Sequence, residues 1–131
     1  MKVDHIGIAT NQLADSLDLW RDTLGLEVDS TETVADQGVK IAMLALGETH
    51  VELLEPLTPD SPIGKFLAKR GPGIHHIAVE VKDIKASLAN LAEKGARLID
   101  QEPRVGAGGC LVAFIHPSST NGVLLELVQR Q

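Results

Sequence analysis

The chain has 131 residues, of which 44% are hydrophobic and 23% charged, and its formal net charge is -6 at pH 7. This length suits one domain, or two small modules fused into one. The net negative charge leaves no basic surface that could neutralise nucleic-acid phosphates. Aromatic residues, on which bases could stack, are almost absent. We therefore expect a protein that acts on a small molecule and has no nucleic-acid partner.

Membrane and secretion signals are not evident in the sequence. No run of apolar residues approaches the ~20 residues of a membrane span, and the N-terminal segment 1–9 contains acidic and polar breaks that a signal peptide lacks. The single cysteine, Cys110, cannot form an internal disulfide and is interpreted as a small buried hydrophobe. We expect a cytoplasmic protein without membrane contact.

The first half of the chain predicts a strand, a helix and further strands. Segment 3–9 alternates bulky aliphatic residues with His5, Gly7 and Ala9, which would lie on the opposite face of a strand. Leucines at helical spacing then predict a helix over 11–25. The strands expected after it cover residues 26–28, 39–46 and 50–54.

The second half predicts the same order of elements. Segment 76–81 alternates in the same way and places His76 beside the small Ala78. Asp83 is expected to cap a helix that ends near Gly95. The strands expected after it cover residues 97–99, 111–115 and 123–128.

These two halves predict a single domain over 1–131 with mixed α+β structure. The first module covers about 1–57 and the second about 73–131. Between them, segment 60–71 is expected to contain a short connecting helix, with Pro62 at its first position.

A histidine and a glutamate occur at matching positions of the two repeats. His5 corresponds to His76 on the first strand of each half, and Glu52 corresponds to Glu126 on the last. If the halves pack about a pseudo-two-fold axis, these four side chains converge. Two imidazoles and two carboxylates suit a divalent cation and leave room for substrate.

Taken one by one, these residues also have ordinary structural interpretations. A histidine in a strand is often a structural residue whose hydrogen bonds are made within the fold. A glutamate in a strand is often a polar residue on the solvent-facing side of a half-exposed strand. The residues alone therefore leave metal binding and a structural role both open. Among the other candidates, His50 and His116 have no repeat partner and are expected to be structural, His75 is expected on the face opposite His76, and Glu80 is expected at a rim.

The glycine-rich segment 106–109 does not match a nucleotide-binding loop. It is not followed by Lys and Ser or Thr, and it does not open a predicted helix, so we expect a flexible turn or lid. Candidate contacts for an anionic substrate are Lys65, Lys69, Arg70 and Arg104, although for any single one of them ordinary solvated surface is the favoured interpretation.

In order and spacing, eight segments of the chain together resemble the vicinal oxygen chelate superfamily and, within it, the methylmalonyl-CoA epimerase family. The resemblance covers essentially the whole chain, and its segments are 4–9, 38–47, 51–57, 60–67, 73–81, 102–109, 114–117 and 122–129.

This resemblance implies a fold and a site. The fold would be two tandem βαβββ modules that form a cupped mixed sheet around a metal site. The implied metal ligands are His5, His76 and Glu126, with Glu52 at a fourth position where the family motif admits Gln or Glu. Co²⁺ is the ion expected first, with Mn²⁺, Ni²⁺, Zn²⁺ or Mg²⁺ as alternatives. A homodimer is implied as well.

The implied activity is the metal-dependent epimerisation of (R)- and (S)-methylmalonyl-CoA, an acyl-CoA of propionate metabolism, through an enolate. Glu126 and Glu52, from opposite modules, are the candidate acid and base. One alternative is lactoylglutathione lyase (glyoxalase I), although segment 116–119 lacks the DPDG-like turn of that family. A non-catalytic small-molecule binder of the same fold is the other, although its usual aromatic walls are missing here.

Overall fold

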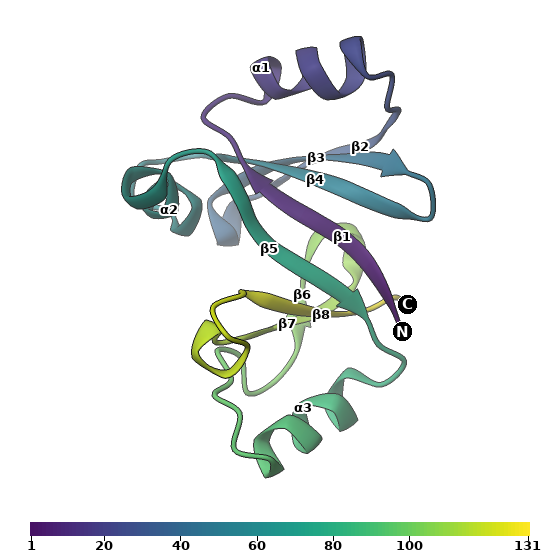
Figure 1. Cartoon of the computed structure of the whole chain (residues 1–131), viewed down its shortest axis with the longest axis vertical. Coiled ribbons are helices and arrows are strands. Elements are labelled where there is room, and N and C mark those ends of the chain that lie inside the picture. Colours follow the sequence, from purple (N-terminus) through teal and green to yellow (C-terminus); the bar gives the residue numbers. More distant parts are fainter. The chain divides into compact units, whose positions relative to one another are not determined.

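The computed structural model describes residues 1–131, and these residues divide into two compact units. One unit contains residues 5–75, and the other contains residues 1–4 and 76–131. Each unit has the element order strand, helix and three strands that the repeat predicts (Figure 1). No helix is long and apolar enough to span a membrane.

The unit of residues 5–75 contains four neighbouring strands in the order β2-β3-β4-β1. β1 is parallel to β4, and the other neighbours are antiparallel. The elements are β1 (Lys2–Ala9), α1 (Leu13–Leu17), β2 (Val28–Val34), β3 (Val39–Leu46), β4 (Thr49–Pro56) and α2 (Pro62–Arg70).

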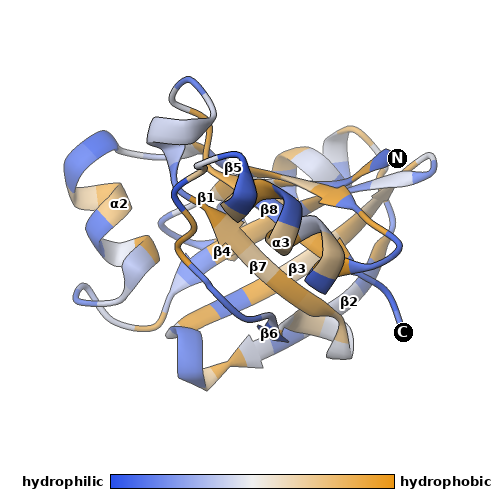
Figure 2. Cartoon of the chain, turned by 90° about the horizontal axis from the view of Figure 1, so that it is seen from below, coloured by the Kyte–Doolittle hydropathy of each residue, from blue (hydrophilic) through white to orange (hydrophobic).

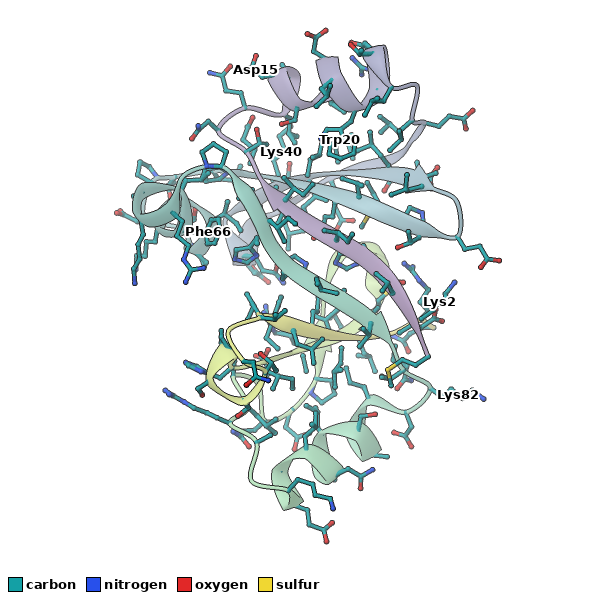
Figure 3. The ribbon with its side chains drawn as sticks, viewed as in Figure 1. Lys2, Asp15, Trp20, Lys40, Phe66 and Lys82 are labelled. Atoms are coloured by element: carbon teal, nitrogen blue, oxygen red, sulfur yellow. The ribbon has the colours of Figure 1, made fainter.

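The core of this unit lies between one face of the sheet and the first helical segment. Figure 1 shows α1 along that face, and in Figure 3 the side chain of Trp20 lies between the helical segment and the strands. Because side chains alternate along a strand, Glu52 points away from this core. The buried members of the cluster are Leu13, Ala42, Leu44, Val51 and Leu53.

The other unit repeats this plan with the strand order β5-β8-β7-β6. β5 is parallel to β8, and β8, β7 and β6 are antiparallel neighbours. The elements are β5 (Gly73–Glu80), α3 (Ile84–Glu93), β6 (Arg104–Val105), β7 (Leu111–Ile115) and β8 (Leu125–Gln129).

α3 covers one face of this sheet, and its buried residues pack on β7 and β8. In Figure 2, β7 carries the colours of hydrophobic residues, whereas α3 has both hydrophobic and hydrophilic stretches. The buried members of this cluster are Val81, Ile84, Leu88, Ala113, Ile115 and Leu127. A smaller cluster lies on the opposite face, with Ala78, Cys110, Val112 and Val128. Cys110 is therefore a buried residue, as predicted.

The helix expected over 11–25 is shorter and less regular than predicted. α1 ends at Leu17, and the chain continues as a π-helical segment, Asp18–Thr23. The strand expected at 26–28 begins only at Val28, because the amide of Leu26 donates to the carbonyl of Trp20 at 3.0 Å and stays with the end of the helical segment.

The prediction of a strand over residues 97–99 is wrong. Only Leu98 forms a bridge, with Ile115. The amides of Ile99 and Asp100 both donate to the carbonyl of Phe114, so the regular alternation of a strand ladder is lost.

The connecting helix expected within 60–71 is α2. The hydroxyl of Ser61 caps it by accepting from the amide of Gly64 at 3.1 Å, and Pro62 occupies its first position as predicted. α2 belongs to the unit of residues 5–75. That the whole chain is one domain, with modules over 1–57 and 73–131, stays a prediction.

Candidate functional site

In the unit of residues 5–75, the structure brings together His5 on β1 and Glu52 on β4. The parallel register places Glu52 opposite Gly7, two residues beyond His5. Residues two apart share a face of a strand, so the glutamate reaches back across the small Gly7 toward the imidazole. His5 Nε2 lies 3.5 Å from Glu52 Oε1. Both residues are buried, with 4% and 5% of their surface exposed.

The other unit has the same arrangement with His76 on β5 and Glu126 on β8. Here the register places Glu126 opposite Ala78, again two residues beyond the histidine. His76 Nε2 lies 2.9 Å from Glu126 Oε1, and both residues are buried. The sequence repeat is thus a repeat of side-chain geometry, with one buried His–Glu pair in each unit.

The chemistry of these donors fits a divalent cation. A buried carboxylate is costly unless a positive partner or a hydrogen-bond donor compensates it. Each carboxylate here has an imidazole nitrogen as its neighbour, so each pair offers one nitrogen and one oxygen. Such mixed ligands suit several divalent ions. The role of the four residues as metal ligands stays a prediction.

Phe114 is a residue of this region that the sequence analysis did not single out. It lies directly opposite Glu126 in the antiparallel pair of β7 and β8. Its ring meets the ring of His76 edge to face, with centroids 5.6 Å apart. The corresponding position in the other unit is Met43, which lies opposite Glu52. The shift in numbering that relates His5 to His76 also relates Met43 to Phe114, so the repeat contained this signal.

The other histidines contact neighbouring side chains or backbone groups, and their structural role stays a prediction. His50 Nε2 lies 2.8 Å from Asp29 Oδ2. His116 Nδ1 accepts from the amide of Ser118 and orders the turn after β7. The ring of His75 lies edge to face against Phe66, which Figure 3 places on α2.

An ion pair in the second unit holds the beginning of β1. Arg130 donates to both carboxylate oxygens of Asp4, at 2.8 and 3.0 Å. Burial by itself lowers the pKa of Arg130, but the charge and the hydrogen bonds of Asp4 outweigh it and raise the pKa above its ordinary value. The residue before His5 is therefore anchored by a bidentate, charge-assisted contact.

Comparison with known proteins identifies the family to which the sequence of this chain belongs. The profile of the Glyoxalase/Bleomycin resistance protein/Dioxygenase superfamily matches residues 4–114. An ethylmalonyl-CoA/methylmalonyl-CoA epimerase of Cereibacter sphaeroides is 43% identical over 130 residues, which are 98% of this chain and 97% of the relative. The chain belongs to the methylmalonyl-CoA epimerase family.

Solved structures of that family have the same fold. A Streptomyces coelicolor methylmalonyl-CoA epimerase variant in complex with 2-nitronate-propionyl-CoA superposes with a TM-score of 0.95 and 43% identity, covering 98% of this chain and 94% of that one. A methylmalonyl-CoA epimerase in complex with methylmalonyl-CoA and NH4+ gives 0.94 and 43%, with 98% and 93% covered. The predicted vicinal oxygen chelate fold is thereby confirmed.

The alternative enzyme of the same superfamily is more distant. A lactoylglutathione lyase of Arabidopsis thaliana is 21% identical over 126 residues, which are 96% of this chain but 43% of that protein. The similarity is therefore much stronger to the epimerase family than to the lyase.

Proposed function

We propose that this protein catalyses the epimerisation of methylmalonyl-CoA in a metal-dependent reaction. The observation that carries the proposal is the buried His–Glu pair that each of the two units contains, in a chain that is 43% identical to a named ethylmalonyl-CoA/methylmalonyl-CoA epimerase. The similar epimerase that binds methylmalonyl-CoA supports the choice of substrate.

The proposal requires the two pairs to bind one ion together. His5, His76, Glu126 and Glu52 would then supply two nitrogens and two oxygens, and substrate oxygens would take open positions. A divalent cation bound there, Co²⁺ first among the candidates, would supply positive charge that stabilises the enolate form of the substrate.

The chain's own carboxylates would move the proton. The hydrogen to be exchanged lies between a carboxylate and a thioester carbonyl, which makes it acidic. Inversion needs a base on one side of that carbon and an acid on the other. Glu52 and Glu126 come from different repeats, so they are our candidates for the two sides. A carboxylate that holds a cation firmly is a weaker base, and the proposal therefore includes a looser carboxylate contact once substrate is bound.

Proton NMR of methylmalonyl-CoA in D₂O tests this function. We expect the protein with added Co²⁺ to remove the α-hydrogen signal and to interconvert the epimers, and we expect EDTA to stop both. No exchange, together with conversion of the methylglyoxal–glutathione adduct, would show a lactoylglutathione lyase instead. No reaction in either assay would refute the proposed substrate.

We also propose that the enzyme works in the cytoplasm as a homodimer. The resemblance to the epimerase family supports the dimer, and the single, buried Cys110 is compatible with a reducing compartment. Sedimentation equilibrium of the purified protein tests the dimer directly.

A further inference from the structure

Arg104 lies on the same face of its sheet as the His76–Glu126 pair. It pairs with Val112 across β6 and β7, and Val112 shares a face with Phe114, two residues further along. Phe114 in turn lies directly opposite Glu126. Arg104 is therefore two strands away from the carboxylate that we propose as a catalytic group, and on the same side.

Two contacts position the guanidinium of Arg104. Its central carbon lies 5.7 Å from the centroid of the Phe114 ring, a cation–π distance. Its Nε lies 3.4 Å from Asp100 Oδ1. The same Phe114 ring also contacts the ring of His76, at a centroid distance of 5.6 Å. One aromatic ring therefore separates the guanidinium of Arg104 from the imidazole of His76.

The remaining donors of Arg104 are available to a ligand. Its side chain is 42% exposed, and its contact with Asp100 is made through Nε, at the base of the guanidinium. Two other cations of the unit are held by carboxylates: Lys2 lies 3.6 Å from Glu80, and Arg130 is bound to Asp4. A guanidinium held from one side and open on the other is well suited to bind carboxylate or phosphate through two parallel hydrogen bonds.

We propose that Arg104 binds an anionic group of the acyl-CoA substrate and thereby positions the substrate over the His76–Glu126 face. The inference rests on the proposed function, because it takes the ligand to be an acyl-CoA. Such a ligand offers two kinds of anion, the carboxylate of its acyl part and the phosphates of its nucleotide part. Both match the geometry of the guanidinium fork.

A merely structural role for Arg104 is disfavoured by its contacts. The ion pair with Asp100 is long, at 3.4 Å, and its arginine is 42% exposed, so it contributes little to stability. Asp100 is also held without Arg104, because its Oδ2 accepts from the amide of Phe114 at 2.8 Å. Replacing Arg104 should therefore leave the fold intact while it removes the ligand contact.

The test compares R104Q with the matched control R97Q, which removes an exposed arginine of the same unit. The dissociation constant would be measured by calorimetry for methylmalonyl-CoA and for methylmalonyl-pantetheine, which lacks the nucleotide phosphates. For R104Q we expect methylmalonyl-CoA to bind about 10-fold or more weakly, as for a lost charge-assisted hydrogen bond. KM should rise in parallel, kcat and Tm should stay near wild type, and R104K should restore part of the affinity.

The two ligands identify the anion. Equal weakening for both ligands assigns Arg104 to the carboxylate, and weakening for methylmalonyl-CoA alone assigns it to a phosphate. Dissociation constants of R104Q equal to those of R97Q for both ligands would overturn the inference. A wild-type protein that binds methylmalonyl-CoA without exchanging its α-hydrogen would refute the proposed function, while the ratio of dissociation constants would still decide the role of Arg104. A wild-type protein that binds neither ligand would refute both.

Discussion

At the scale of single residues, the candidate site depends on a small residue beside each histidine. Gly7 and Ala78 lie opposite the two glutamates, and Ala78 is fully buried. A larger side chain at either position would occupy the space through which the carboxylate reaches the imidazole. The size of these residues is therefore as much a part of the site as the charge of the glutamates.

Replacing Glu126 with Gln should remove a proton-transferring group and keep the shape of the side chain. We expect E126Q to slow α-hydrogen exchange of methylmalonyl-CoA by about 10²- to 10⁴-fold, the usual contribution of one general acid or base. Proton NMR in D₂O measures the rate, and metal analysis of the same sample separates loss of the base from loss of the ion. E80Q is the matched control, since Glu80 pairs only with the half-exposed Lys2 among the described ion pairs. Exchange at the wild-type rate in E126Q would place the base elsewhere.

At the scale of elements, the helix that covers each sheet keeps the core on one face and leaves the other face to the His–Glu pair. α3 does so in the second unit through Ile84 and Leu88, which are buried against β7 and β8. Its beginning is defined by Asp83, whose Oδ1 accepts from the amide of Ala86 at 3.1 Å. The amide of Ile84 donates to Gln129 at the end of β8, so the helix is also tied to the strand that carries Glu126.

Removing the cap of α3 should destabilise the protein modestly. We expect D83A to lower the free energy of unfolding by about 1 kcal/mol, because an amide at the first turn loses its acceptor. Urea denaturation followed by circular dichroism measures this difference. K85A, an exposed change in the same turn that removes no cap, should unfold at the wild-type midpoint. Equal midpoints for D83A and the wild type would show that the cap does not stabilise α3.

At the scale of the whole molecule, the proposed function needs the two His–Glu pairs to act as one site. The alternative is a separate role for each pair within its own unit. The two possibilities differ in stoichiometry, because one shared site binds one ion per chain whereas two independent sites bind two.

Metal analysis of purified protein loaded with Co²⁺ should give one ion per chain. We expect H5A and H76A each to abolish that binding, because removing one ligand of a shared site weakens all the others' hold on the ion. H50A is the control, since His50 is engaged with Asp29. If H5A kept half of the ions bound to the wild type, the pairs would be separate sites and the shared site would be refuted.

Much of the fold follows from local patterns in the sequence. The alternation around His5 and His76 predicted the faces of the first strands, and Asp83 was correctly expected to begin a helix. These features depend on residues close in the chain, where side-chain period and capping act directly. The matching His and Glu of the two repeats are also visible in the sequence, because the two halves can be compared position by position.

Other features were decided only by tertiary structure. The parallel registers that set Glu52 opposite Gly7 and Glu126 opposite Ala78 join residues far apart in the chain. The cation–π contact of Arg104 with Phe114 likewise depends on how β6 and β7 pair. The reason is physical: a periodic pattern defines which side of a strand a residue faces, but packing between distant strands defines which residue it meets.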